Sequence, residues 1–195
     1  MREATEQRKQ RIWEVLSRRQ PDLTLVLDNI HDPHNVSAIF RSCDAFGVPR
    51  VHLYYTTEAF PELGRKSSAS AMKWVEQERH SQPQELLDTL QGQGFSIFAT
   101  GFGSRSIPLP QCDLTRPAAV ILGNEHRGSS PELAEKVDGE LFIPMQGMVQ
   151  SFNVSVAAAI ILYEAWRQRR ACERPQRSGF DEETLEALYR DWCTK

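Results

Sequence analysis

Residues 118–165 read AAVILGNEHRGSSPELAEKVDGELFIPMQGMVQSFNVSVAAAIILYEA, and this stretch decides the fold. It holds two short aliphatic runs, AAVILG and ELFIPM, and each of them leads into a loop that contains glycine. Short apolar runs bounded by turn residues are typical of buried strands, and the alanine-rich segment from Val154 predicts a helix. Ligands of open α/β sheets bind outside the carboxyl ends of the strands, so the two loops favour a ligand crevice. Two ordinary loops between strands and helices are the alternative interpretation.

Helices and strands alternate along the rest of the chain, which predicts one domain built on a parallel sheet. The expected strands cover residues 22–30, 50–55 and 95–100, and the expected helices cover 2–19, 36–46, 83–90 and 181–193. Asn35 and Ser81 are expected to cap the second and third of these helices, and Gly47 to end the second. Residues 56–74 have no clear period and are expected to form a polar loop, with a short helix within 67–74.

The length and composition of the chain limit the classes of protein to which it can belong. At 195 residues, 40% of them hydrophobic and 25% charged, the chain suits one globular domain with its own core. No apolar run approaches the roughly 18 residues of a membrane span, and the charged first 20 residues are unlike a signal peptide. The four cysteines lack the spacing of metal ligands, which predicts free thiols, no metal and a cytoplasmic location.

Charge is unevenly distributed along the chain, although the formal net charge is only -3. Basic residues gather in residues 1–20 and again in 166–177. Such clusters indicate contacts with an RNA phosphate backbone. The candidate contacts are Arg8, Arg11, Arg19 and Arg167. Arginines near the end of a helix are also favoured by the helix dipole, so the clusters alone do not establish RNA binding.

Other nucleotide-binding and catalytic signatures are weak. Gly101 and Gly103 follow an expected strand, but the full GxGxxG pattern is absent, which argues against an ordinary dinucleotide-binding fold. His31 and His34 flank a proline without a further set of ligands, and they are more simply polar loop residues. No Ser/His/Asp or Cys/His arrangement is recognisable.

Three motifs resemble those of one family of RNA-modifying enzymes. ILGNEHRG and FIPMQGMVQSFNVSVAAAIILYEA closely resemble the last two motifs of the SPOUT RNA methyltransferases, and HDPHNVSAIFRSCDAFGV is similar to the first motif of their TrmH family. The resemblance runs from about Gln20 to Arg170. It implies an α/β fold with a parallel sheet flanked by helices, a deep trefoil knot in the C-terminal segment, and a homodimer. It also implies helical extensions at 1–20 and 173–195 around a methyltransferase domain at 21–172.

The resemblance also assigns roles to single residues. The catalytic set that matches the family motifs is Asn35, Arg41, Glu125, Ser151 and Asn153. The set expected around S-adenosylmethionine is Thr100, Gly101, Gly123, Ile143, Met148 and Phe152. Without the resemblance, the two asparagines are ordinary helix caps and Glu125 is a carboxylate in a turn. Arg41 either removes the proton of a ribose hydroxyl or stabilises the developing alkoxide while binding a phosphate, and the second role suits a guanidinium group better.

The family implies methyl transfer from S-adenosylmethionine to the ribose of guanosine 18 in the D-loop of tRNA. Three alternatives stay open from the sequence. A ribosomal RNA 2′-O-methyltransferase would share all three motifs but usually carries a separate N-terminal RNA-binding domain. A non-catalytic RNA-binding protein would not need the intact motif residues. A small-molecule enzyme of α/β type would be expected to show the missing glycine signature.

Overall fold

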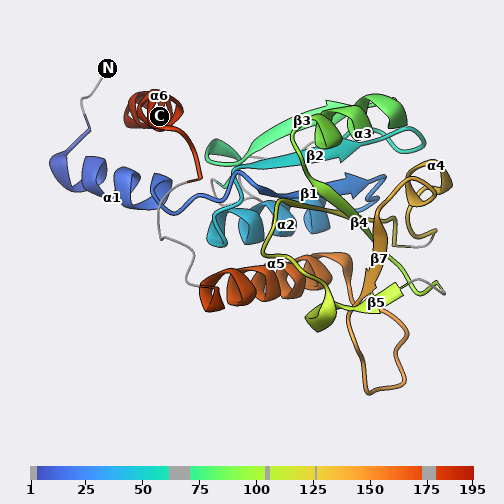
Figure 1. The fold of residues 1–195 in the computed structure, drawn as a ribbon. Helices are drawn as coiled ribbons and strands as arrows, with labels where there is room; N and C mark the ends of the chain where they lie inside the picture. Colours follow the sequence, from blue (N-terminus) through green and yellow to red (C-terminus); the bar gives the residue numbers. More distant parts are fainter. Residues whose placement is uncertain (1–3, 62–70, 104–105, 126, 173–178) are drawn as a thin grey trace.

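The computed structural model describes residues 4–61, 71–103, 106–125, 127–172 and 179–195. In this part of the chain, seven parallel strands form one sheet in the order β3-β2-β1-β6-β4-β7-β5 (Figure 1). The strands are β1 (Leu23–Asp28), β2 (Arg50–Tyr54), β3 (Glu76–His80), β4 (Ser96–Thr100), β5 (Ser106–Pro108), β6 (Ala118–Leu122) and β7 (Gly139–Phe142). The helices are α1 (Glu6–Leu16), α2 (Pro33–Ala45), α3 (Pro83–Gly92), α4 (Pro131–Ala134), α5 (Val154–Ala171) and α6 (Glu182–Thr194), with short 3-10 helices η1 (Ala71–Lys73) and η2 (Leu109–Gln111). The expected parallel sheet flanked by helices is confirmed.

The central strands are buried from end to end. β6 is entirely apolar, and the two polar residues of β1, Thr24 and Asp28, are hydrogen-bonded. Every residue of β1 and β6 is buried, as expected for strands of a parallel sheet that is covered on both faces. Leu25 of β1 pairs with Val51 of β2 on one side and with Val120 of β6 on the other. These strands form the centre from which the loops of the site leave.

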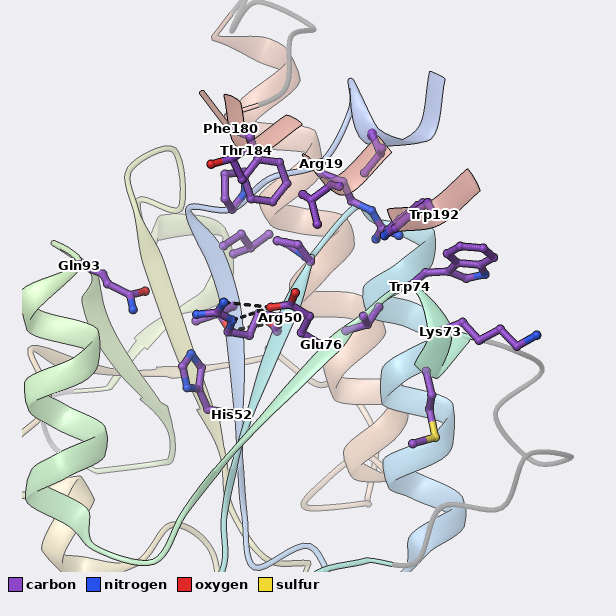
Figure 2. Close-up of a pocket in the computed structure, with 18 of the residues that line it drawn as sticks. Arg19, Arg50, His52, Lys73, Trp74, Glu76, Gln93, Phe180, Thr184 and Trp192 are labelled. Carbon is purple, nitrogen blue, oxygen red and sulfur yellow. Dashed lines mark hydrogen bonds and ion pairs between the residues drawn. The ribbon is translucent and has the colours of Figure 1, made fainter. Parts of the chain in front are cut away.

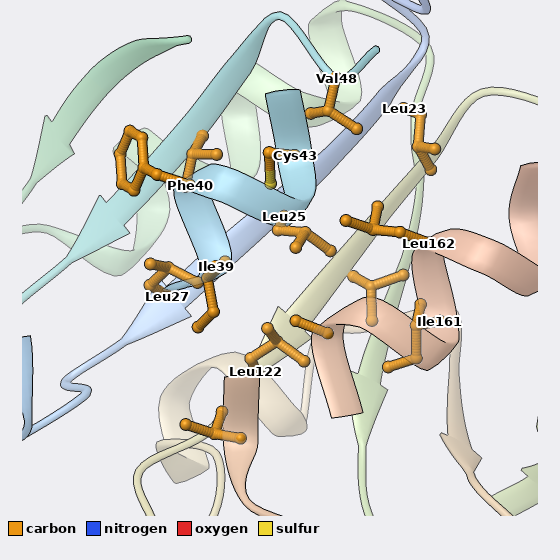
Figure 3. Packing of buried hydrophobic residues seen from close by; sticks show 14 of the residues in the cluster. Leu23, Leu25, Leu27, Ile39, Phe40, Cys43, Val48, Leu122, Ile161 and Leu162 are labelled. Carbon is orange, nitrogen blue, oxygen red and sulfur yellow. The ribbon is translucent and has the colours of Figure 1, made fainter. Parts of the chain in front are cut away.

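Helices α2 and α5 cover one face of the sheet. Leu25 and Leu122 of the sheet belong to the same core as Ile39 of α2 and Ile161 of α5 (Figure 3). Helices α3 and α4 cover the other face through a second cluster of buried aliphatic side chains. Replacing one of these buried leucines or isoleucines by alanine would cost about 2–5 kcal/mol of stability.

Helices α1 and α6 come from opposite ends of the chain and pack against each other (Figure 1). Ile12, Leu16 and Trp192 form their buried contact, and Trp13 lies edge-on to Tyr189 with 5.5 Å between ring centroids. The pair lies beside the amino ends of the strands. None of the helices in the described part of the chain is long and apolar enough to span a membrane.

The beginning of α2 differs from the expectation in a way that matters for the site. The helix starts at Pro33, and Asp32 is its N-cap, since the Asp32 side chain accepts a hydrogen bond of 2.8 Å from the backbone N–H of His34. Asn35 is therefore not the cap but lies in the first helical turn, where its side chain is free for another role. Gly47 follows the end of the helix with a φ of 75°, as expected.

The polar and short elements are the ones that the sequence patterns miss. β3 has the polar sequence EQERH at the edge of the sheet, and β5 has only three residues. The N-cap of α3 is Gln82 rather than Ser81, and its side chain makes no capping hydrogen bond. The short helix expected within 67–74 falls partly outside the described residues, and η1 is its described portion.

Candidate active site at the carboxyl ends of the strands

Four neighbouring strands end at the same edge of the sheet. β1, β6, β4 and β7 are adjacent and parallel, so the loops that follow them leave from one edge. Two of these loops are the glycine-containing loops after β6 and β7 that the sequence analysis marked as the sides of a crevice. The structure therefore brings the two marked loops to a common edge, next to the start of α2.

Hydrogen bonds join one residue from each of the three motifs into what we call the polar row, Glu125–Asn35–Asn153. Asn35 in the first turn of α2 donates from Nδ2 to Oε1 of Glu125 at 2.8 Å. Its Oδ1 accepts a hydrogen bond of 3.0 Å from Nδ2 of Asn153. Asn153 also caps α5, because its Oδ1 accepts from the backbone N–H of Ser155 at 2.9 Å. Residues that are far apart in the sequence thus form one continuous chain of polar contacts.

The Glu125 carboxylate accepts hydrogen bonds from two segments, the first turn of α2 and the loop after β1. Besides the bond from Asn35, its Oε2 accepts from the backbone N–H of His31 at 3.2 Å. Partial burial by itself raises the pKa of Glu125, but hydrogen bonds from Asn35 and nearby backbone N–H groups outweigh burial and lower the pKa below its ordinary value. The ionised carboxylate is therefore a fixed acceptor that orients the amide of Asn35.

The loop after β6 has a tight, closed shape. Asn124 and Gly128 exchange two backbone hydrogen bonds, each of 2.9 Å. The closure brings the chain back so near to Gly123 that a Cβ atom there would lie 2.2 Å from the carbonyl carbon of Gly128. The Asn124 side chain donates to the backbone carbonyl of Asn29 at 2.6 Å, which ties the loop to the end of β1.

Asn29 supports the site and was missed by the sequence analysis. Its φ of 50° is in the left-handed region, which asparagine tolerates better than most residues. Its Oδ1 accepts hydrogen bonds of 2.9, 3.0 and 3.2 Å from the backbone N–H groups of Thr56, Thr57 and Glu58. Asn29 therefore joins the loop after β1 to the loop after β2. The available signal was an asparagine directly after a buried strand.

Most residues expected around S-adenosylmethionine follow adjacent strands. Thr100 ends β4 and donates from Oγ1 to a backbone carbonyl of β6 at 3.2 Å, while the N–H of Gly101 donates to a carbonyl of β7 at 3.0 Å. Gly123 and Ile143 directly follow β6 and β7. These four residues are therefore at one edge of the sheet, as the resemblance implied.

The loop between β7 and α5 leaves apolar side chains uncovered. Phe152 is 39% exposed and Met148 is 99% exposed, so the Met148 side chain does not join the other expected cofactor residues. Uncovered apolar side chains beside the ends of strands are a feature of ligand-binding surfaces. This loop therefore provides apolar side chains and backbone groups, which are the usual lining of a cofactor pocket.

Arg41 and Ser151 complete the expected catalytic set, and both are exposed. Arg41 lies near the end of α2, six residues after Asn35, and no other described residue makes a hydrogen bond or ion pair with its side chain. The structure therefore does not bring Arg41 into the polar row. Its guanidinium group is open to a ligand, and Ser151 stands just before the N-terminus of α5.

The comparison with known proteins decides the family. The sequence matches the SpoU rRNA Methylase family over residues 22–163, a range that contains the whole polar row. The chain belongs to the SpoU rRNA Methylase family.

Relatives within the SpoU family are similar over the full length of the chain. A protein of Thermus thermophilus named tRNA (guanosine(18)-2′-O)-methyltransferase is 45% identical over 195 residues, which is 100% of both chains. The crystal structure of the TrmH/SpoU tRNA modifying enzyme of Aquifex aeolicus matches with a TM-score of 0.89 and 39% identity, covering 97% of this chain and 96% of that one. The SpoU methyltransferase AviRb of Streptomyces viridochromogenes, solved in complex with the cofactor AdoMet, matches with a TM-score of 0.70 and 26% identity over 80% of this chain and 62% of that chain.

Arg19 of this SpoU-family chain is not available to RNA, contrary to the expectation. Its side chain is buried, donates to Oδ1 of Asp44 at 2.6 Å and to the carbonyl of Val48 at 3.2 Å, and lies 5.1 Å from the ring of Trp192. Burial lowers the pKa of Arg19, and the neighbouring Asp44 carboxylate opposes that effect. The arginine connects the segment after α1 to α2, which is a structural role.

The other expected RNA contacts lie on the surface. Arg8 and Arg11 are exposed on α1, and Arg167 is exposed near the end of α5. Arg167 forms a two-pronged ion pair with Glu164, with N–O distances of 2.7 and 2.8 Å. Its charge is therefore partly neutralised, and Arg11 also has a carboxylate neighbour, since its Nη1 lies 3.6 Å from Oε2 of Glu14.

A cavity of about 340 Å³ lies at the opposite edge of the sheet (Figure 2). The first residues of β1, β2 and β3, including Arg50 and Glu76, face residues of α6 such as Trp192 across it. Arg19 is the one residue among all those expected in a site that lines this cavity. The cavity and the polar row are therefore separate features at opposite ends of the strands.

Proposed function

We propose that this chain transfers the methyl group of S-adenosylmethionine to the 2′-oxygen of guanosine 18 in the D-loop of tRNA. The observation that carries the proposal is the polar row, in which Glu125, Asn35 and Asn153 meet beside the strand ends. These residues come from the three motifs that resemble the methyltransferase family. The name of the full-length relative from Thermus thermophilus supports the substrate.

S-adenosylmethionine binds where the loops after β4, β6 and β7 leave the sheet. When bound, it supplies a methyl group on a positively charged sulfur. The residues assigned to it are Thr100, Gly101, Gly123, Ile143, Met148 and Phe152. Backbone groups of these loops bind the polar edges of the cofactor, and the uncovered apolar side chains of residues 143–152 form a wall for the adenine. The AviRb structure with AdoMet supports the choice of cofactor.

Arg41 and the start of α5 act on the RNA side of the reaction. The guanidinium group of Arg41 binds the phosphate next to the target ribose and stabilises the negative charge that develops on the 2′-oxygen. Ser151 and Asn153 stand at the N-terminus of the 18-residue helix α5, where a phosphate group is favoured. The polar row fixes this helix end relative to α2, which carries Arg41.

Exposed arginines bind the rest of the tRNA. Arg8, Arg11 and Arg167 contact phosphates, and such contacts position an RNA without reading its bases. Arg19 takes no part, because it is buried against Asp44.

The C-terminal segment forms the deep trefoil knot of the family. Helix α5 contacts the connection between β5 and β6: Gln168 accepts from the N–H of Leu114 and donates to the carbonyl of Cys112, both at 2.9 Å. Arg169 donates to the carbonyl of Leu114 at 2.8 Å. These contacts support a path in which the chain after β7 returns past this connection before it ends in α5.

Two copies of the chain pair through α5. Val156, Tyr163 and Trp166 are 45%, 52% and 38% exposed, and their spacing of seven and three residues puts them on one side of the helix. An apolar stripe on the surface of a helix is typical of an interface, and a two-fold dimer is the commonest soluble assembly.

The proposal also covers the two ends of the chain and the location of the protein. A methyltransferase domain at 21–172 lies between an N-terminal extension at 1–20 and a C-terminal extension at 173–195, and the helices α1 and α6 of the two extensions contact each other. The four cysteines, all within the described residues, are free thiols, which suits the reducing cytoplasm where tRNA is modified.

Incubation of the purified protein with isotopically labelled S-adenosylmethionine and bulk RNA tests the proposal. The expected result is label in tRNA and none in ribosomal RNA. Label in ribosomal RNA alone would favour the ribosomal RNA methyltransferase. Normal binding of tRNA without any transfer would favour a non-catalytic RNA-binding protein.

A further inference from the structure

Two histidines and a glutamate meet on neighbouring strands, away from the polar row. His52 is in β2, and Glu78 and His80 are in β3, the edge strand of the sheet. Nδ1 of His52 lies 3.0 Å from Nε2 of His80. The Glu78 carboxylate oxygens lie 3.9 Å from the first of these nitrogens and 3.7 Å from the second.

The two imidazole rings are buried and lie within hydrogen-bond distance of each other, but the hydrogen bonding of His80 is incomplete. His52 is 1% and His80 is 2% exposed. Nδ1 of His80 is buried and has no hydrogen-bond partner among the described residues. A histidine binds a metal ion through a lone pair of one ring nitrogen, and the two nitrogens that face each other here, Nδ1 of His52 and Nε2 of His80, are the candidate ligand atoms.

The three groups have the spacing of ligands around one small cation. A tetrahedral Zn²⁺ with bonds of about 2.0–2.1 Å holds its ligand atoms about 3.4 Å apart. The two ring nitrogens are 3.0 Å apart, Oε2 of Glu78 lies 3.9 Å from the nitrogen of His52, and Oε1 of Glu78 lies 3.7 Å from the nitrogen of His80, so each separation is within about 0.5 Å of that value. We propose that His52, Glu78 and His80 bind one divalent transition metal ion, of which Zn²⁺ is the natural candidate, with water in the fourth position.

The charges around the cluster suit a dication. Arg50 donates to Oε2 of Glu78 at 3.3 Å, but it also bonds Oε2 of Glu76 from two nitrogens, at 2.9 and 3.2 Å. Figure 2 shows this pairing of Arg50 with Glu76 near His52. Arg50 is therefore shared between two carboxylates, and the group of Arg50, Glu76 and Glu78 carries one net negative charge beside the two rings.

The position of the cluster defines what the ion would do. His52 lines the cavity at the amino edge of the sheet, and Glu78 is part-exposed, so an ion can reach the cluster from solvent. A bound ion would join the edge strand β3 to β2. The predicted absence of metal rested on cysteine and histidine spacing, and that spacing does not reveal ligands contributed by two paired strands.

The test is a metal titration of the full-length protein after treatment with a chelator. We expect Zn²⁺ to bind with a stoichiometry of one per chain and to raise the melting temperature, and Co²⁺ to give the visible absorption bands of a tetrahedral site. His80→Gln and Glu78→Gln should each weaken Zn²⁺ binding by more than about 100-fold. Glu78→Gln is the milder change, since Glu78 is part-exposed and removal of its charge leaves its shape.

Matched controls separate this cluster from other side chains that bind Zn²⁺. His34→Gln and Cys172→Ser alter an exposed histidine and an exposed thiol, and both variants should keep the wild-type isotherm. Absence of Zn²⁺ binding by the wild-type protein would overturn the proposal. So would tight binding that survives in Glu78→Gln, or binding that is lost in either control.

Discussion

At the scale of single residues, Asn35 links the other two members of the polar row, Glu125 and Asn153. Its amide donates to Glu125 and accepts from Asn153, so both of its polar atoms are used. This arrangement depends on Asp32, which caps α2 and leaves the Asn35 side chain free. A residue that looks like an ordinary helix cap in the sequence is therefore the one that joins the three motifs.

Arg41→Ala should lower the rate of methyl transfer by about 10²-fold or more, because loss of one preorganised donor to a developing oxyanion has that effect. Arg41 is exposed and lies outside the cofactor loops, so binding of S-adenosylmethionine should stay unchanged. Single-turnover kinetics and calorimetry of cofactor binding measure the two quantities. A variant with nearly full activity would remove Arg41 from the mechanism, and loss of cofactor binding in a folded variant would place it in the cofactor site.

Gly123→Ala should destabilise the protein by about 1–3 kcal/mol, the usual cost of forcing an atom into filled space. The added Cβ would lie 2.2 Å from both the Gly128 carbonyl carbon and the Ser129 nitrogen, so the loop that carries Glu125 has to open. Gly92→Ala is the matched control, since nothing lies within 4 Å of a Cβ at the end of α3. Urea unfolding should show a loss for the first variant and no loss for the second, and equal stabilities would contradict the closed loop.

Arg19 shows why residue roles are harder to predict than motifs. Its sequence context, a basic segment near a helix end, is the same as that of its exposed neighbours. Only the folded chain brings Asp44 and the Val48 carbonyl to its guanidinium group. The burial of a charged side chain depends on partners that are distant in sequence, and neither composition nor periodicity contains them.

At the scale of elements, the sequence predicted the apolar strands and the amphipathic helices, but it did not predict the polar edge strand β3. β6 is entirely apolar and β1 is apolar apart from Thr24 and Asp28, and both were expected within a few residues of their observed bounds. β3 was missed because an edge strand needs no apolar period, and its backbone pairing with β2 alone makes it a strand. The position of the loops after β6 and β7 at one edge was predictable, because all strands of a parallel sheet end at the same edge.

The junction of α2, the loop after β6 and α5 should be sensitive to acid through Glu125. The pKa of this carboxyl is lowered from 4.5 in the folded state, so the unfolded chain binds its proton first as the pH falls. Its contribution to stability is fully present above about pH 4.5 and is lost as the pH falls through the lower folded-state value.

Urea unfolding of the wild type and of Glu125→Gln at several pH values between 6 and 3 measures this contribution. The wild type should be the more stable protein at pH 6, and the difference should shrink below pH 4.5. A difference that is the same at every pH would show that the carboxylate charge does not hold the junction.

At the scale of the whole molecule, different features lie at the carboxyl ends and at the amino ends of the strands. The carboxyl edge holds the polar row, whereas the amino edge holds the cavity and the contact of α6. The exposed stripe of α5 predicts a homodimer, with twice the chain mass of 22.2 kDa in sedimentation at micromolar concentration. Tyr163→Glu should give folded monomers, because it puts a charge into an apolar interface. A wild-type protein that sediments as a monomer would contradict the proposed pairing.

The most direct test of the proposed reaction is to locate the transferred methyl group on tRNA. The protein is incubated with S-adenosylmethionine and a full tRNA transcript, and nuclease digestion with mass spectrometry identifies the modified nucleotide. A second tRNA that carries 2′-deoxyguanosine at position 18 is treated in the same way. The expected result is one methyl group on the 2′-oxygen of guanosine 18 in the first tRNA and none in the second. A methyl group on a base, on a ribose of the anticodon loop, or on the deoxy-substituted tRNA would contradict the proposed reaction.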